Sequence, residues 1–323
     1  MRIVLNKTMT GETFDITNLL TSYTWQGSVE QAVRQFSFDM INAPYDKEIR
    51  AIVPQVTIGD IVSLYTDSDY AVPNYLLFYG KVTSTGKRSK RGSITYNCLD
   101  FLSNLSKSET NKTYDSTAEG IAVSIASEFG LQIGAVVPTG VSIGKSVFED
   151  KTYLSIITEA YKKAGLSTGK NYYIQMDGDK FCVLEEGMVE IPVTLKDTVN
   201  IFDSSFEESI SEMVNRVNIY DSDGVFQTRI EDADLIARFG LYERNYTIEK
   251  DVDMATGAKK QLHGVDTVIR FTLVGEVNYW SGRSIRVWDE GLGLAGKFLI
   301  THDTHTWSGS NYTTVVDLKF ISL

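Results

Sequence analysis

STAEGIAVSIASEFG, residues 116–130, is the clearest helix in a chain that otherwise consists of strand and turn patterns. Ser116 and Glu119 have the spacing of a capping box, in which the two side chains satisfy free amide groups at a helix N-terminus. Apolar residues recur at helical spacing from Ala118 to Phe129, and Gly130 can adopt the left-handed conformation that ends a helix. The sequence therefore predicts a helix between Ser116 and Gly130.

A second helix is predicted over residues 154–164, with Gly165 ending it in the same way. Two strand patterns then follow, residues 172–176 and 180–185, separated by Asp177-Gly178, which is a strong hairpin signal. Helices of about twelve residues are marginally stable alone in water, so both helices need a common surface, most simply this hairpin. Residues 116–188 are therefore expected to form a small α+β module.

The arms on either side of the module, residues 1–115 and 189–323, are predicted to be β domains. Short strands separated by Gly and Asp turns indicate an antiparallel barrel or sandwich in each arm. In the first arm Phe36, Phe38 and Met40 alternate with polar residues, as in a half-buried strand. The second arm has strand patterns at residues 213–220, 268–274, 284–288, 297–302 and 313–321, and a short helix pattern at residues 232–239 before Gly240.

The arms share an order of features. Three segments of the first arm, residues 59–64, 80–82 and 94–101, have counterparts at residues 282–287, 296–298 and 313–320. The number of residues between matched segments differs by only a few from one pair of segments to the next. Glycine and alternating strands are common, so these landmarks alone do not establish a duplication. If the repeat is real, the same β domain is present twice and the module is inserted after the first copy.

The composition limits the class of protein. With a net charge of −11, the chain does not resemble a binder of nucleic acid, because phosphate contacts need Lys and Arg. No basic, cleavable leader and no run of eighteen apolar residues is seen, so we expect neither export by that route nor a membrane span. Cys98 and Cys182 lie in apolar strand patterns and are expected to be buried free thiols, although a disulfide stays possible.

Three motifs resemble ligand sites but lack the required context. Residues 291–296 match G-x-G-x-x-G, yet a strand follows where the pyrophosphate would need a helix N-terminus. Residues 140–146 are one residue short of a Walker A loop, and the next helix starts near Thr152 instead of at the lysine. Asp221-Ser222-Asp223-Gly224 begins like a calcium loop but is better explained as a hairpin turn.

His302-Asp303-Thr304-His305 resembles a metal or acid–base cluster. Residues three apart on a strand face opposite sides, so the two histidines cannot bind one ion, whereas Asp303 and His305 can pair as ordinary strand decoration. The remaining histidine, His263, is expected in a polar loop. We therefore predict no catalytic residue, no cofactor-binding residue, no metal ligand and no enzymatic activity. The basic cluster at residues 87–91 is expected to be a solvated hairpin tip or a contact with an acidic neighbouring subunit.

An ordered set of segments resembles the XkdQ/YqbQ family of baseplate hub proteins, which occur in contractile phage tails and tail-like bacteriocins. The resemblance covers most of the chain, is closest over residues 24–170 and is looser over residues 225–260. The segments that carry it are YTWQG (23–27), QAVRQFSF (31–38), GDIV (59–62), LFYGKV (77–82), YNCLDFL (96–102), TAEGIA (117–122), AYKKA (160–164), GKF (296–298) and DTHT (303–306).

The resemblance implies a structural protein with two tail-tube-like domains per chain. Three chains would form a ring that joins the six-fold tail tube above to a three-fold spike below and encloses a channel. The implied partners are two further copies, the tube protein, the spike and other baseplate proteins, with nucleic acid or tape-measure protein only as cargo. The implied location is a virion or bacteriocin baseplate assembled in the bacterial cytoplasm, without membrane or cofactor. We also expect acidic residues on the channel wall. The alternative is a tail-associated peptidoglycan hydrolase or carbohydrate-binding module.

Overall fold

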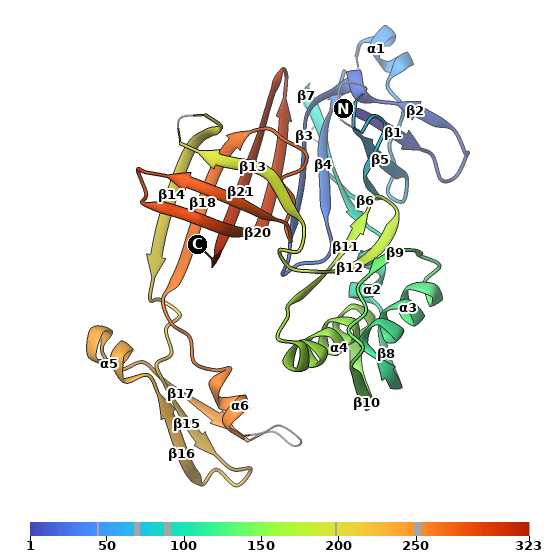
Figure 1. Cartoon of the computed structure of the whole chain (residues 1–323). Coiled ribbons are helices and arrows are strands. Elements are labelled where there is room, and N and C mark those ends of the chain that lie inside the picture. The colour runs from blue at the N-terminus through green and yellow to red at the C-terminus, as the bar shows by residue number, and fades with distance from the viewer. Residues whose placement is uncertain (44, 68–71, 87–91, 198, 249–253, 323) are drawn as a thin grey trace. The chain divides into compact units, whose positions relative to one another are not determined.

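The computed structural model describes residues 1–322 except 44, 68–71, 87–91, 198 and 249–253 (Figure 1). The described residues divide into two compact units, one formed by Met1–Ser204 and Arg270–Leu323 and the other by Ser205–Ile269. Strands dominate the secondary structure, as the sequence predicts. Among the described helices, none combines the length and the apolar character that a membrane span requires.

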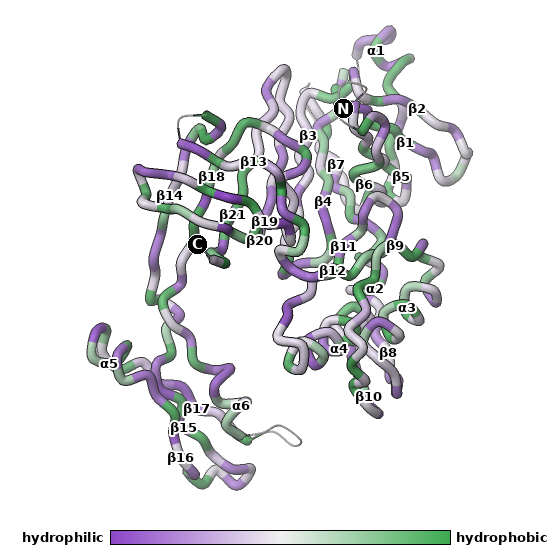
Figure 2. Tube along the Cα trace, viewed as in Figure 1, coloured by the Kyte–Doolittle hydropathy of each residue, from purple (hydrophilic) through white to green (hydrophobic). Residues whose placement is uncertain are grey.

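The first arm contributes consecutive antiparallel strands to a large sheet in the larger unit. Their order is β1 (Arg2–Asn6), β5 (Ile61–Tyr65), β6 (Leu76–Gly86), β7 (Gly92–Asp100), β4 (Gln35–Asn42) and β3 (Leu20–Ser28). The short β2 (Thr13–Asp15) pairs with β1, and the connections contain η1 (Thr17–Leu19) and α1 (Lys47–Ile52). The predicted alternation is present in β4, where Phe36, Phe38 and Met40 are buried in one core with Trp25. Figure 2 shows the corresponding alternation of hydrophobic and hydrophilic residues along these strands.

The second arm repeats this strand order. Its strands follow one another as β13 (Glu190–Lys196), β19 (Ser284–Asp289), β20 (Leu294–Ser308), β21 (Asn311–Ser322), β18 (Asp266–Val274) and β14 (Ile201–Ser209). Position for position, β13 corresponds to β1, β19 to β5, β20 to β6, β21 to β7, β18 to β4 and β14 to β3. One pairing differs, because β13 and β19 are parallel whereas β1 and β5 are antiparallel.

Backbone hydrogen bonds support the correspondence between the arms. The amide of Gly59 donates to the carbonyl of Val82 at 2.8 Å, and the amide of Gly282 donates to the carbonyl of Ile300 at 2.8 Å. Both glycines have positive φ, 94° and 89°, which residues with a side chain rarely adopt. The sequence landmark that paired Gly59 with Gly282 therefore marks the same turn in both arms.

A β-bulge is also present at the corresponding place in each arm. The ladder between β6 and β7 skips Thr83, and the ladder between β20 and β21 skips Thr301. The Thr83 hydroxyl donates to the carbonyl of Asn97, and the Thr301 hydroxyl donates to the carbonyl of Asp317, both at 3.1 Å. When the two bulges are aligned, the other two matched pairs of segments, 80–82 with 296–298 and 94–101 with 313–320, move by only one or two positions from their pairing in the sequence.

The arms are joined edge to edge, because β20 of the second arm pairs antiparallel with β3 of the first. β20 also pairs with β19 and β21, so the sheet branches there and contains 13 strands. Of the two alternatives expected for each arm, a barrel or a sandwich, the barrel is therefore wrong for the described residues. The edge of β3 that would have to close the first arm on itself is occupied by β20, and the result is an open, mainly antiparallel sheet.

The α+β module contains the two predicted helices, α3 (Ala118–Glu128) and α4 (Tyr153–Thr168), and the predicted hairpin of β11 (Tyr172–Asp177) and β12 (Lys180–Glu185). These elements share one core, which confirms that the helices pack on the hairpin surface. Four further elements complete the module: α2 (Leu102–Lys107), β8 (Glu109–Thr117), β9 (Gln132–Val136) and β10 (Ser142–Thr152). β8 pairs with β10, and β9 adds to β12 in parallel.

Two predicted helix boundaries of the module are wrong. Thr117, not Ser116, caps α3 by accepting the Gly120 amide, and Glu119 instead accepts hydrogen bonds from the 139–140 turn. Helix α4 continues through Gly165 and ends at Gly169, which has the left-handed conformation. The sequence offered two glycines at suitable spacing, and the later one caps the helix.

The smaller unit is a three-stranded sheet with two short helices. β15 (Arg216–Tyr220) lies between β16 (Phe226–Glu231) and β17 (Glu243–Thr247), and the helices are α5 (Ala233–Phe239) and α6 (Met254–Lys259). Its core contains Val217, Ile219, Tyr246 and Ala258. The predicted strand, turn and short helix here are confirmed, but their separation into a compact unit was not predicted. In the first arm, the corresponding strands β3 and β4 are connected by residues 29–34 alone.

Candidate functional site: the junction of the two arms

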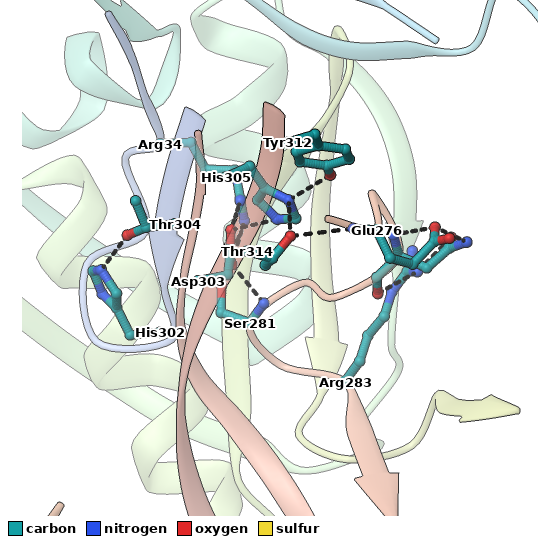
Figure 3. A network of polar contacts seen from close by, with 11 residues as sticks. Arg34, Glu276, Ser281, Arg283, His302, Asp303, Thr304, His305, Tyr312 and Thr314 are labelled. Carbon is teal, nitrogen blue, oxygen red and sulfur yellow. Dashed lines mark hydrogen bonds and ion pairs between the residues drawn. The ribbon is translucent and has the colours of Figure 1, made fainter. Parts of the chain in front are cut away.

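A buried polar network lies where the two arms meet (Figure 3). Asp303 on β20 accepts hydrogen bonds from the Arg34 guanidinium, with Nη1 at 3.2 Å from Oδ1 and Nη2 bonded to Oδ2. The Ser281 amide donates to the same carboxylate at 2.6 Å. All three residues are buried. Arg34 comes from the connection between β3 and β4, so the ion pair connects the first arm to the second.

Aromatic rings enclose the Arg34 guanidinium. Its Cζ lies 4.2 Å from the ring centre of Trp25 and 5.2 Å from that of Trp280, which come from different arms. Arginine is suited to this position because its planar cation stacks on rings while its N–H groups bind a carboxylate in pairs. In addition, the Arg34 amide donates to Asp100 at 2.8 Å. Arg34 is therefore held by its backbone and by its side chain.

His305 extends the network within the second arm. Its Nδ1 lies 2.9 Å from the Tyr312 hydroxyl and 3.2 Å from the Thr314 hydroxyl, and its Nε2 lies 3.3 Å from Asp303 Oδ2. Burial lowers the pKa of His305, although the neighbouring Asp303 opposes this shift, so the imidazole is held neutral. Burial alone would raise the pKa of Asp303, but the Arg34 charge and the hydrogen bonds hold it well below its usual range.

The structure confirms part of what the histidine cluster predicted. His302 and His305 are separated by the strand, since His305 is buried while His302 lies on the other face with Nε2 3.3 Å from the Thr304 hydroxyl. Asp303 and His305 do lie together. Their description as ordinary strand decoration is wrong, because both are fully buried. Arg34 was missed because it lies 269 residues from Asp303 and no local pattern connects them.

The three discarded ligand motifs occupy turns and strands. β20 begins at Leu294, inside the 291–296 glycine motif, and β10 begins at Ser142, inside the 140–146 motif. Asp221 accepts the amides of Asp223 and Val225, as a hairpin turn between β15 and β16 requires. The cysteines are buried and free, as predicted. Across the described ranges no group of three His, Cys, Asp or Glu residues is placed to hold a metal ion. The basic cluster at 87–91 lies outside the described residues.

The junction also produces a continuous solvent-facing surface. Opposite the buried core, strands β21, β20, β3, β4, β7 and β6 align their side chains in three transverse rows of six. The rows are Val315, Thr304, Gln26, Gln35, Leu99 and Lys81; Thr313, Thr306, Thr24, Ser37, Asn97 and Ser84; and Asn311, Ser308, Ser22, Asp39, Thr95 and Gly86. Two of these eighteen residues are charged, compared with 23% of the whole chain. The surface is therefore built mainly of hydroxyl and amide groups.

Residues 23–319 match the model of the YQBQ-like family. The chain belongs to this family. The match includes the module, Arg34 and Asp303 of the junction, and both repeated sheets except β1, β2 and the outer ends of β3 and β21. It confirms the resemblance found in the sequence. No curated protein matches the YQBQ-like chain.

Solved structures with the same fold include two tail proteins, one of them from a prophage. The 43 kDa tail protein of prophage MuSo2 from Shewanella oneidensis has a TM-score of 0.74 at 15% identity, covering 99% of this chain and 98% of that chain. A tail protein from Neisseria meningitidis has a TM-score of 0.67 at 16% identity, covering 98% and 96%. The Escherichia coli c3393 protein, a type VI secretion component described as similar to the phage T4 tail proteins gp27 and gp5, has a TM-score of 0.53 at 11% identity, covering 94% and 74%.

The His305 environment predicts a pH dependence of stability. A histidine whose pKa is lowered by folding stabilises the fold above its ordinary pKa of 6.5, and this contribution is lost as the pH falls through the lower folded value. We expect His305→Gln to lower the free energy of unfolding at pH 8. At pH 5 we expect this loss to be smaller than at pH 8 by about 1 kcal/mol or more. Urea unfolding of both proteins at the two pH values measures this.

Comparing His305→Gln with the unchanged protein removes an opposing pH dependence of stability that comes from Asp100. Burial raises the pKa of Asp100 to about 7, so the stability that this group contributes declines as the pH rises from about 4 to 7. Because Asp100 is present in both proteins, it does not affect their difference. A destabilisation by His305→Gln that grows toward pH 5 would show instead that His305 is protonated in the fold.

Proposed function

We propose that this protein is the structural hub of a contractile tail baseplate, in a phage or a tail-like bacteriocin. Three copies form a ring that joins the six-fold tail tube to a three-fold spike and encloses a channel. The family and the tail proteins that share the fold support a structural role in a tail. Nothing in the described residues favours the alternative of a peptidoglycan hydrolase or carbohydrate-binding module.

The duplicated sheet is the observation that carries this proposal. Each chain supplies the same strand order twice, down to the bulges at Thr83 and Thr301. Three chains therefore supply six similar sheets, which is what a three-fold assembly needs to match a six-fold tube. Ring closure also fits the general preference of oligomers for closed symmetry. We accordingly regard residues 1–115 and 189–323 as two tube-like domains and residues 116–188 as the module between them.

We place the channel wall on the three rows of hydroxyl and amide side chains. This surface runs across both arms and carries Asp39 and Lys81 as its charged residues, so a passing chain of either charge meets little attraction or repulsion. The rows cover only β20 and β21 of the second arm, so the expectation of acidic residues elsewhere on the channel wall stays a prediction. The wall fits nucleic acid or tape-measure protein as cargo, because it lacks the Lys and Arg clusters that hold phosphates.

More than half of the acidic excess lies in residues 205–269, which include the end of β14. This segment has 13 acidic and 7 basic residues, which account for −6 of the net charge of −11. A surface of this charge favours basic partners. In the proposed hub the smaller unit and the module would contact other baseplate proteins, while the sheets form the ring.

The mass of the purified protein tests the proposed ring. We expect light scattering of the protein alone to give three times the 36.1 kDa of one chain, or, if the ring needs its partners, three copies of this chain in the complex with the tube and spike proteins. The physical reason is that the exposed sheet edges of each copy remain unsatisfied until the ring closes. A mass of one chain at every concentration, with or without these partners, would contradict the proposal.

A further inference from the structure

Among the described strands of the large sheet, β14 and the end of β6 each have an open edge. β14 is one of the terminal strands of the sheet and pairs with β18 alone among the described strands. β6 pairs with β5 only as far as Lys81, so on that side residues 83–86 have no described neighbouring strand. Open edges present free amide and carbonyl groups that another strand can pair with.

The repeat relates these two edges to the junction inside the chain. β6 corresponds to β20, and β14 corresponds to β3. Beyond the bulge at Thr301, β20 pairs antiparallel with β3 from His302 to Ser308. The residues of β6 beyond the matching bulge at Thr83 are the open ones. The chain therefore contains one completed junction and the two halves of a second.

Side chains at the open edges also lack partners. Thr85 occupies the position in β6 that Asp303 occupies in β20, since each is the second residue after its bulge. Asp303 binds Arg34 across the junction, whereas the Thr85 hydroxyl is buried and has no hydrogen-bond partner. On β14, Phe202 and Phe206 are 65% and 42% exposed. Large exposed apolar residues on an edge strand indicate a covered surface in the assembled protein.

We infer that β14 of one copy pairs antiparallel with residues 83–86 of β6 in the next copy, reproducing the β20–β3 junction. This inference rests on the proposed function and identifies the occupant of both edges as a second copy of the chain. The contact is head to tail, since the two edges differ, and a head-to-tail contact generates a closed ring when its rotation allows closure. Each copy contains two sheets joined by one internal junction. In a closed ring of three copies, internal and intermolecular junctions therefore alternate.

The internal junction also gives the register. His302, the first residue after the bulge, pairs with Ser28, the last residue of β3. The matching residues are Ser84 in β6 and Ser209 at the end of β14, which like β3 has nine residues. Ser84 of one copy is therefore expected to face Ser209 of the next.

Cysteine pairs test this register in the full chain. Each copy would carry Ser84→Cys and Ser209→Cys, and under mild oxidation we expect covalent dimers and trimers on a non-reducing gel. The native cysteines do not interfere, because both are buried. The matched control combines Ser84→Cys with Phe202→Cys, seven residues and roughly 23 Å further along β14, and it is expected to give no cross-link.

A second variant tests the edge without a disulfide. Phe202→Lys is expected to raise the dissociation constant of the trimer at least about tenfold, because it places a charge in the covered contact. Phe226→Lys on β16, where the side chain is 52% exposed, is the control and should leave the mass unchanged. A trimer that forms no Ser84–Ser209 cross-link and is insensitive to Phe202→Lys would overturn this interface while leaving the hub intact. A protein that stays monomeric would overturn both.

Discussion

Replacing Asp303 with asparagine is expected to lower the free energy of unfolding by about 3–5 kcal/mol. The substitution leaves the buried Arg34 guanidinium without its counter-ion, while Trp25 and Trp280 still exclude water from it. A charge left unpaired in such a place costs far more than the loss of a hydrogen bond in water. Urea unfolding followed by tryptophan fluorescence measures the effect.

The exposed ion pair of Arg270 and Asp317 provides a matched control on the same sheet. Its atoms are as close, at 2.7 and 2.9 Å, but the Arg270 side chain is 53% exposed. Asp317→Asn should therefore cost about 0–1 kcal/mol. Combining Arg34→Met with Asp303→Asn should cost less than the sum of the two single changes, because the unpaired charge is removed. Equal losses for Asp303→Asn and Asp317→Asn would show that the buried pair does not hold the arms together.

Gly282→Ala is expected to destabilise the protein by about 2–5 kcal/mol, more than the corresponding change at Gly59. Both glycines have positive φ, so each alanine variant bears a backbone cost of about 1–2 kcal/mol. A Cβ at Gly282 would also lie 2.1 Å from the Tyr173 ring, whereas nothing lies within 4 Å of a Cβ at Gly59. Crowding of this kind adds about 1–3 kcal/mol.

The pair of glycine variants separates backbone strain from crowding. Urea unfolding of Gly59→Ala gives the strain alone, and the difference from Gly282→Ala gives the clash with Tyr173 of the module. Replacing the aromatic ring with a smaller side chain, as in Tyr173→Leu, should restore part of the free energy of unfolding that Gly282→Ala removes. Identical losses at both glycines, with no recovery, would contradict the packing of the module against the second arm.

The elements predicted well from the sequence are those with a strong local signal. The periodicity of α3 and α4 and the Asp177-Gly178 turn fix the core of the module without reference to the rest of the chain. The same holds for Gly59 and Gly282, where a turn with positive φ demands glycine in both arms. Each of these features is determined by residues close together in the chain.

The features that sequence reasoning missed depend on distant contacts. At the start of α3, Thr117 is the capping residue, and Glu119 accepts hydrogen bonds from the 139–140 turn, about twenty residues further along the chain, instead of completing a capping box. The junction of β20 with β3 joins the two ends of the chain, and it prevents the closed barrel that the strand pattern alone allowed. Arg34 carries no local sign of its role, because its partner comes from a strand near the other end of the sequence.

The duplication gives these observations a common explanation. A sheet present twice in one chain can be joined to itself internally, as β20 and β3 show, and leaves equivalent edges for the next copy. The two arms also differ, because the second arm contains the 205–269 unit where the first arm has only the short connection of residues 29–34. The polar network around Arg34 strengthens only the internal junction. The position in β6 that corresponds to Asp303 is Thr85, which carries no charge.

Rotationally averaged electron microscopy of the purified protein, alone or bound to its tube and spike partners, tests the central claim most directly. The account predicts a ring with three-fold symmetry in which six similar densities surround a channel, two from each chain. A ring with one such density per chain, or particles without a ring under all these conditions, would contradict it.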